Sequence, residues 1–256
     1  MNERIDAGHQ HIDLSACDRE PIHIVGSVQP HGFLLALAQP ALTVVQASAN
    51  APAAARAGST LDDAYPELAA LVRRYLDGGA DQDGATYLRT VALGHGPERQ
   101  AYEVAAHRVD DLVVLELEEA ADLAGETGLD ALTPRLRAFV ERLHAARGVE
   151  DLCHLLAEEI RHVTGFDRAL VYRFDRDWHG TVLAEDGNGV LPSYLDLRFP
   201  ASDIPAQARE LYRRNRLRII PDAGYVPVPV RPATTPAGRP LDLSQSVLRS
   251  VSPVHV

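Results

Sequence analysis

The sequence predicts an α+β protein with two domains, each containing an antiparallel sheet flanked by helices. Two observations predict this class. Short apolar or alternating runs bounded by turn residues are typical of strands, and they occur in two groups, at 32–49 with 102–118 and at 168–185. Stretches with helical spacing of apolar residues separate them. The length of 256 residues and the 46% hydrophobic content are sufficient for two buried cores.

The first group of strands opens with a hairpin. Residues 32–38 and 43–49 flank the turn-forming stretch 39–42. The following region, 51–76, is rich in Ala, Leu and Arg and predicts short helices, and strands then follow at 102–105 and 112–118. This order of elements is typical of a small α+β sensor module.

The second group begins after an acidic stretch. Residues 119–130 contain two glycines and no apolar period, which predicts a linker with the domain boundary near residue 122. Thr133 followed by Pro134 predicts a helix start, and helical spacing continues to Gly148. We expect a second helix at 150–163, followed by strands at 168–174 and 180–185 around the polar loop 175–179.

Residues 198–212 predict a capped amphipathic helix. Ser202 and Asp203 can accept hydrogen bonds from the first turn, and Pro205 suits that turn because its missing N–H would have no partner there. Three apolar residues share one helix face: Ile204, Ala208 and Leu211. Further along, 221–240 contains six prolines, which excludes a central strand or helix and predicts a long, stiff loop.

Composition excludes several functional classes. A formal charge of −11 and a pI near 5.4 argue against nucleic-acid binding. No apolar run approaches about 18 residues and the N-terminus lacks a secretion signal, so we expect a soluble cytoplasmic protein with no membrane partner. No Gly-rich phosphate loop is present.

The two cysteines, Cys17 and Cys153, form no CxxC pair, so neither a disulfide framework nor a thiolate zinc site is predicted. Cys153 lies among leucines on a predicted helix, which places it in the core. Cys17 lies in a polar segment where its thiol is accessible. His9 and His11 could bind a metal with Asp13 and Cys17, but no second cluster completes four ligands, and we predict no metal site.

Three segments carry a resemblance to a known family. Residues 17–32 read CDREPIHIVGSVQPHG and resemble the start of a bacteriophytochrome. Residues 199–212 read FPASDIPAQARELY and resemble the chromophore-domain motif of that family, and residues 248–255 read LRSVSPVH and provide a third match. The resemblance therefore covers essentially the whole chain, from about Leu14 to Val256.

The resemblance implies a domain plan. An N-terminal extension, 1–16, precedes a PAS domain at 17–122 and a GAF domain at 123–256, whose C-terminal part would be missing from this chain. In that family the proline-rich GAF loop is a lasso that encloses the N-terminal segment in a figure-of-eight knot. Here the enclosed segment would be 14–30, with apolar contacts from Ile22, Ile24 and Val28.

The resemblance also implies a pigment, biliverdin IXα, a linear tetrapyrrole that Cys17 would hold through a thioether to a vinyl group. Arg218, Arg249 and Tyr212 match groups that bind the pigment's propionates, and Ser252 and His255 match pocket positions close to the pigment. Tyr172 and Phe199 match aromatic walls around its D ring. The backbone carbonyl of Asp203 would meet the pyrrole nitrogens, with Ile204 and Pro205 beside it.

The function implied is that of a red/far-red photoreceptor fragment that signals by photoisomerisation. The output would lie outside this chain, in a PHY domain and commonly a histidine kinase, so the chain itself would not be an enzyme; homodimer formation is left open. Two alternatives are a GAF-type sensor of a small ligand such as a cyclic nucleotide and a pigment-free PAS–GAF interaction scaffold.

Overall fold

The structure, a computed structural model, describes residues 20–79, 84–94, 99–120, 129–215 and 217–251. The chain divides into two compact units. The first comprises Met1–Ala121 together with Ala206–Val256, and the second comprises Asp122–Pro205.

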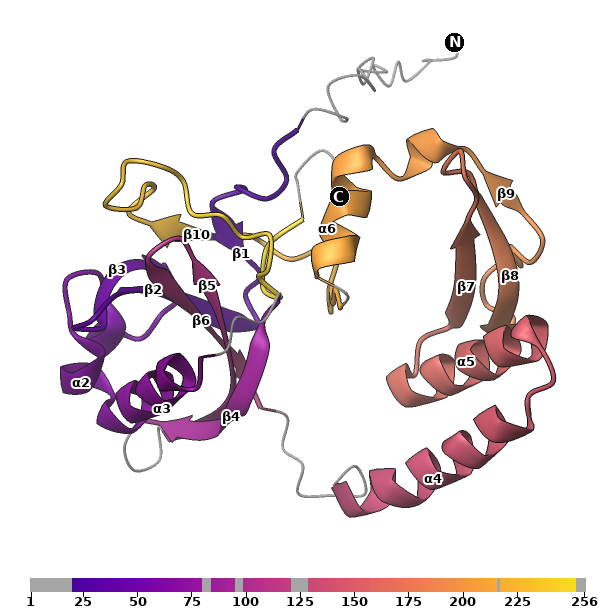
Figure 1. Cartoon of the computed structure of the whole chain (residues 1–256), viewed down its shortest axis with the longest axis horizontal. Coiled ribbons are helices and arrows are strands. Elements are labelled where there is room, and N and C mark those ends of the chain that lie inside the picture. The colour runs from indigo at the N-terminus through magenta and orange to yellow at the C-terminus, as the bar shows by residue number, and fades with distance from the viewer. Residues whose placement is uncertain (1–19, 80–83, 95–98, 121–128, 216, 252–256) are drawn as a thin grey trace, which may run out of the picture. The chain divides into compact units, whose positions relative to one another are not determined.

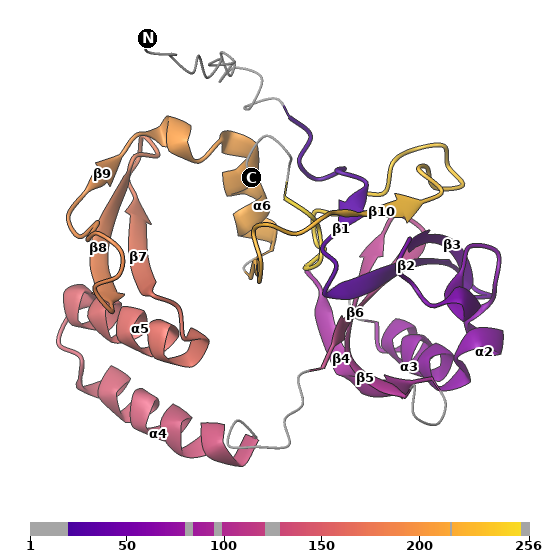
Figure 2. The same ribbon diagram turned by 180° about the vertical axis from the view of Figure 1, so that it is seen from behind.

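The first unit is built on one antiparallel sheet (Figures 1 and 2). Within the described residues its strand order is β1-β10-β3-β2-β6-β5-β4. The strands are β1 (Ser27–Val28), β2 (Gly32–Ala38), β3 (Thr43–Ser48), β4 (Thr86–Leu93), β5 (Gln100–Val109), β6 (Leu112–Glu119) and β10 (Val228–Arg231). The predicted hairpin and the predicted strands at 102–105 and 112–118 are therefore confirmed, whereas β4 was not predicted.

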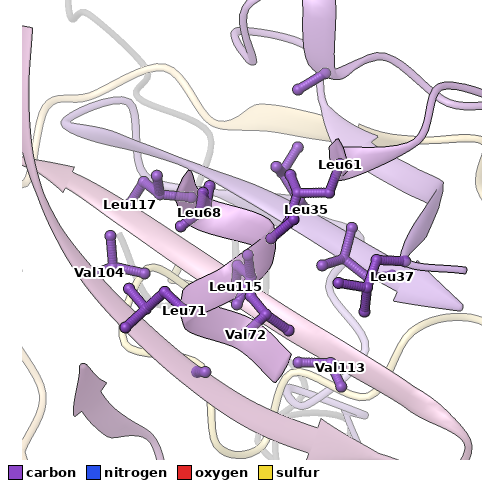
Figure 3. Packing of buried hydrophobic residues seen from close by; sticks show 14 of the residues in the cluster. Leu35, Leu37, Leu61, Leu68, Leu71, Val72, Val104, Val113, Leu115 and Leu117 are labelled. Atoms are coloured by element: carbon purple, nitrogen blue, oxygen red, sulfur yellow. The ribbon is translucent and has the colours of Figure 1, made fainter. Parts of the chain in front are cut away.

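Helices cover one face of this sheet (Figure 1). They are the 3₁₀ turn Ala53–Ala55, α2 (Leu61–Ala64) and α3 (Pro66–Asp77), which confirm the prediction of short helices at 51–76. Figure 3 shows side chains from α2 and α3 packed against strand residues, among them Leu35, Leu115 and Leu117. All three leucines are fully buried, so this layer is the main hydrophobic core of the unit.

The opposite face of the sheet is also buried. Leu34 and Ala36 of β2 and Val114 of β6 point away from the helices. They pack in a second cluster against residues 217–251, called here the C-terminal loop, which supplies Val230, Leu241, Leu243 and Leu248. Because both faces are covered, residues 33–37 of β2 form an unbroken apolar run rather than an alternating one.

The C-terminal loop contacts both edges of the N-terminal segment. On one edge, the N–H of Val230 donates to Gly26 O at 2.9 Å. On the other edge, Leu243 N donates to His23 O at 2.7 Å, and Gln29 N donates to Leu248 O at 2.8 Å. The segment thus lies between two arms of one loop, the local arrangement that a lasso requires. Both views show β1 beside the loop (Figures 1 and 2).

Of the three apolar residues predicted to contact the loop, Val28 is fully buried and packs in the second cluster, and Ile22 and Ile24 are half-buried. The exclusion of a central strand from 221–240 was wrong, because β10 lies between β1 and β3. Pro229 is tolerated because Val230, not Pro229, donates to Gly26 O, while Pro229 O accepts a hydrogen bond from Ala49 N.

The second unit packs helices on a smaller antiparallel sheet. Its elements are α4 (Leu129–Ala145), α5 (Val149–Thr164), β7 (Arg168–Phe174), β8 (Gly180–Gly187) and β9 (Arg198–Phe199), with strand order β7-β8-β9. Cys153 is buried against Ala157 and Ala184, which confirms its assignment to the core. Helix α4 begins before Thr133, contrary to the prediction, because Pro134 removes only one hydrogen-bond donor from the helix.

The predicted helix at 198–212 is divided. Residues Ala201–Asp203 form a separate 3₁₀ turn, and α6 (Ala206–Arg214) begins after Pro205. Ile204 has φ −126° and ψ 100°, because a residue before proline is displaced from helical geometry. Ser202 and Asp203 therefore belong to the turn and do not start α6, which corrects their predicted role. None of the helices in the described ranges is long and apolar enough to cross a membrane.

We expect Leu115→Ala to lower the free energy of unfolding by about 2–5 kcal/mol, because the truncation leaves a cavity between the sheet and α3. Urea unfolding followed by far-UV circular dichroism measures this change. The matched control is Leu217→Ala in the same unit, where the side chain is 61% exposed and the change should remain within about 0.5 kcal/mol. Equal effects of the two substitutions would contradict the assignment of this core.

Candidate functional site

Two arginines of the first unit lie close enough for the charge of one to affect the other, Arg218 half-buried and Arg249 buried. Arg218 follows α6, and its Nη1 donates to Val247 O at 3.1 Å. Arg249 is 9% exposed, and its Nη1 donates to Ile22 O at 2.7 Å. The Nε of Arg249 is buried and has no hydrogen-bond partner in the described part of the chain. At least one strong donor at this place is therefore unsatisfied.

The electrostatics of the pair favour an anion. Burial lowers the pKa of Arg218. Burial, and then the charge of Arg218, lower the pKa of Arg249 to about 10. Among the described residues neither guanidinium forms an ion pair with a carboxylate. A carboxylate or phosphate bound here would satisfy the free donor and compensate two partly desolvated positive charges.

Two tyrosines lie within electrostatic reach of both guanidiniums. They are Tyr212, at the end of α6 and 51% exposed, and Tyr225 in the C-terminal loop. The hydroxyl of Tyr225 accepts a hydrogen bond from Val251 N at 2.6 Å, which fixes it near the arginines. Sequence reasoning named Tyr212 but missed Tyr225, because it treated 221–240 as a loop defined by its prolines alone. An aromatic hydroxyl within that loop was the available signal.

An aromatic cluster forms in the second unit. The ring centroids of Tyr172 and Phe199 are 6.0 Å apart, and those of Tyr194 and Phe199 are 5.7 Å apart. Gly180 allows this packing, since a Cβ at that position would collide with the ring of Tyr172. The predicted pair Tyr172 and Phe199 is thus brought together, while Tyr194 was not predicted.

Asp203 lies close enough to Tyr172 for its charge to act on the Tyr172 hydroxyl. Burial, and then the charge of Asp203, raise the pKa of the Tyr172 hydroxyl. The turn that carries Asp203 is attached to the β7–β8 hairpin, because Ala201 N donates to His179 Nδ1 at 3.2 Å. Ile204 and Pro205 follow directly, half-buried and buried. The predicted site residues that the structure describes therefore lie in two groups, one within each unit.

Three predicted site residues, Cys17, Ser252 and His255, lie outside the described residues. The alternative metal ligands His9, His11 and Asp13 lie outside them as well. Across the ranges that are described, no group of three or more His, Cys, Asp or Glu side chains could hold a metal ion.

A buried polar pair lies on the loop-covered face of the first unit's sheet. His107 of β5 is fully buried, and its Nδ1 lies 3.8 Å from Oε2 of Glu116 on β6, which is 1% exposed. Burial lowers the pKa of His107 to about 4. Burial raises the pKa of Glu116, while hydrogen bonds from Ser246, Val247 and Leu248 lower it. His107 is therefore neutral near neutral pH.

Comparison with known proteins gives one family model and many relatives. A model of the PAS fold matches residues 17–120. The chain is 42% identical to cyanobacterial phytochrome B of Nostoc sp., and the match covers 96% of this chain and 33% of that protein. It is 39% identical to a bacteriophytochrome of Xanthomonas campestris, and that match covers 96% of this chain and 39% of the relative. It thus spans about a third of the length of the curated relatives it matches.

Solved structures of phytochrome chromophore-binding domains are also similar to this chain. The chromophore-binding domain of Stigmatella aurantiaca phytochrome P1 superposes with a TM-score of 0.80 at 42% identity, over 93% of this chain and 80% of that one. The chromophore-binding domain of an unusual bacteriophytochrome from R. palustris superposes with a TM-score of 0.80 at 40% identity, over 93% and 78%. The predicted α+β fold class is confirmed.

We expect the buried His107 to make stability fall in mild acid. Between pH 6.5 and about 4 the unfolded chain binds a proton at this imidazole that the folded chain does not, so unfolding becomes easier as the pH decreases through this range. Between about pH 7 and about pH 5 the wild type should lose about 2 kcal/mol more than His107→Leu. Urea unfolding at both pH values measures the difference. Parallel losses in the two proteins would contradict the lowered pKa.

Proposed function

Since this chain belongs to the bacteriophytochrome family, we propose that it binds biliverdin IXα, a linear tetrapyrrole, and acts as the light-absorbing part of a red/far-red photoreceptor. The observation that carries the proposal is the pair of half-buried Arg218 and buried Arg249, with an unsatisfied Nε on Arg249 and no ion-pair carboxylate among the described residues. Such a pair needs an anionic ligand.

The chemistry of the donor set fits this pigment. A linear tetrapyrrole carries two propionates, and a guanidinium fork matches a carboxylate in charge and geometry. We propose that Arg218 and Arg249 bind the propionates, with Tyr212 hydrogen-bonded to one of them. Tyr225, which lies within reach of both guanidiniums, is an additional candidate.

The remaining predicted residues would enclose the pigment rings. Tyr172 and Phe199 offer an apolar aromatic surface suited to a D ring, and Gly180 leaves room for the ring of Tyr172. Asp203, with Ile204 and Pro205 beside it, would present its backbone carbonyl to the pyrrole nitrogens. Ser252 and His255 would complete the polar surroundings of the rings. When bound, the pigment supplies the light absorption and the isomerisable double bond next to its D ring.

We propose that Cys17 anchors the pigment covalently. The thiol adds across a vinyl side chain: the sulfur forms a new S–C bond, the vinyl π bond breaks, and the thiol proton is transferred to the other vinyl carbon. This addition needs no oxidant and no metal. The thiolate is the reactive form, and a polar, accessible segment favours it over a buried one.

The wider assignments follow from the family. We propose a PAS domain at 17–122 and a GAF domain at 123–256, preceded by the extension 1–16. The signal would reach a PHY domain and a histidine kinase in a longer protein, so this segment would not be an enzyme, and we place it in the cytoplasm. A buried arginine pair would also accept a phosphate, so a nucleotide-binding GAF domain is the rival that pigment binding must exclude.

Co-expression of the chain with a heme oxygenase should give a coloured protein, with zinc-induced fluorescence that remains after denaturation because the thioether is covalent. Cys17→Ala should abolish the fluorescence of the denatured protein and retain only dissociable pigment. The control is Cys153→Ala, which should keep the covalent pigment because this buried cysteine packs in the core. Soluble, folded protein without red absorption would refute pigment binding, and a covalent adduct in Cys17→Ala would refute the attachment site.

Arg249→Gln should weaken non-covalent binding of biliverdin by about 10–100-fold when measured in a Cys17→Ala background, because a charge-assisted hydrogen bond of about 1.5–3 kcal/mol is lost. Arg218→Gln should act in the same direction. Fluorescence titration gives the dissociation constants. The control is Arg213→Gln on α6, where the side chain is 75% exposed and binding should not change. Equal affinities of the Arg249 and Arg213 variants would contradict the anion site.

A further inference from the structure

Glu116 is a buried carboxylate with an unusual set of partners. Its neighbours on β6, Leu115 and Leu117, point into the helix-covered core, so Glu116 points to the face covered by the C-terminal loop. There it accepts three hydrogen bonds, from the hydroxyl of Ser246, from Val247 N at 2.9 Å and from Leu248 N at 2.7 Å. One side chain of the sheet thus holds three consecutive residues of the loop.

Those three residues position both arginines of the anion site. Val247 donates its N–H to Glu116 and accepts from Arg218 Nη1 with its carbonyl at 3.1 Å. Leu248 donates its N–H to Glu116, and its own carbonyl accepts from Gln29 N at 2.8 Å. Arg249 is the next residue in the chain. Displacing residues 246–248 would therefore move the acceptor of one guanidinium and the backbone of the other.

Burial raises the pKa of Glu116, and its three hydrogen bonds oppose that rise by favouring the ionised carboxylate. All three partners donate, and a carboxylate accepts such bonds better than a carboxylic acid does. Near neutral pH His107 is neutral, so it does not draw the carboxylate away as an ion-pair partner. Glu116 also acts on Arg218 through space, because its negative charge favours the protonated guanidinium. The same group thus fixes the geometry and supports the charge of the pair.

We propose that Glu116 is a positioning residue that gives the site its selectivity for the carboxylate groups of the pigment. It does not touch the ligand; it acts through residues 246–248 on Arg218 and Arg249. This inference rests on the proposed function, because it assumes that the arginine pair binds propionates. It goes further in assigning the selectivity of that pair to a side chain of the first unit's sheet.

The test compares two pigments. Biliverdin carries both propionates as anions, and biliverdin dimethyl ester has the same rings without those charges. Both dissociation constants are measured by fluorescence titration of the full chain carrying Cys17→Ala, and their ratio is the preference for the acid. Glu116→Gln should reduce this preference by about tenfold, the size of effect seen when a group that orients a ligand-binding side chain is lost. Affinity for the dimethyl ester should change by less than about threefold.

A structural role alone would give a different result, because loss of folded protein weakens both pigments equally and leaves the ratio unchanged. The matched control is Glu118→Gln, on the same strand, with a side chain that is 32% exposed and has no contact with residues 246–248 among the interactions described. Its preference should equal that of the parent. Ser246→Ala removes one of the three hydrogen bonds to Glu116 and should give a smaller loss of preference in the same direction.

The outcomes distinguish failure of propionate binding by the arginines from failure of the positioning role of Glu116. If the parent chain binds both pigments equally well, the arginine pair does not recognise the propionates. Propionate binding by Arg218 and Arg249 is then overturned. If the parent prefers biliverdin and Glu116→Gln retains the full preference, the positioning role is overturned. Should Glu116→Gln fail to fold, Ser246→Ala decides, and an unchanged preference in that variant overturns the inference.

Discussion

The backbone hydrogen bonds along both edges of residues 23–29 are the contact on which the rest of the first unit depends. Through them the C-terminal loop is held to the N-terminal segment, with Val230 on one edge and Leu243 and Leu248 on the other. Once held, the loop covers the second face of the sheet and buries its apolar residues. Burial of both faces explains why a sheet with helices on only one side contains strands as apolar as β2.

The C-terminal loop also places two positively charged side chains, Arg218 and Arg249, in partly desolvated surroundings. Both lie near Tyr212 and Tyr225. The charge of Glu116 acts on Arg218 and that of Asp242 acts on Arg249, and neither carboxylate forms an ion pair with these guanidiniums. Two carboxylates thus act on the two guanidiniums from beyond ion-pair distance, and the buried Nε of Arg249 still has no hydrogen-bond partner in the described part of the chain. Binding of a dianionic ligand would then lower the electrostatic cost of the buried charges, and folding of the loop and ligand binding would favour each other.

The second unit contributes a different chemistry. Its small sheet presents an aromatic surface from Tyr172, Tyr194 and Phe199, which suits flat conjugated rings and carries little charge. The first unit thus offers guanidinium donors, and the second unit offers aromatic rings.

The sequence by itself determined the fold class, the main hairpins, α5 and the burial of Cys153, because these depend on local periodicity and on turn residues. It also named both arginines, through motif resemblance. Only the tertiary structure decided that β10 pairs on both sides despite Pro229, that Ile204 interrupts the helix before Pro205, and that Glu116 and Tyr225 lie beside the arginine site. Glu116 precedes Ser246 by 130 residues, and no local pattern encodes a hydrogen bond across that separation. Long-range contacts of this kind arise from packing, so they became visible only when the loop was seen against the sheet.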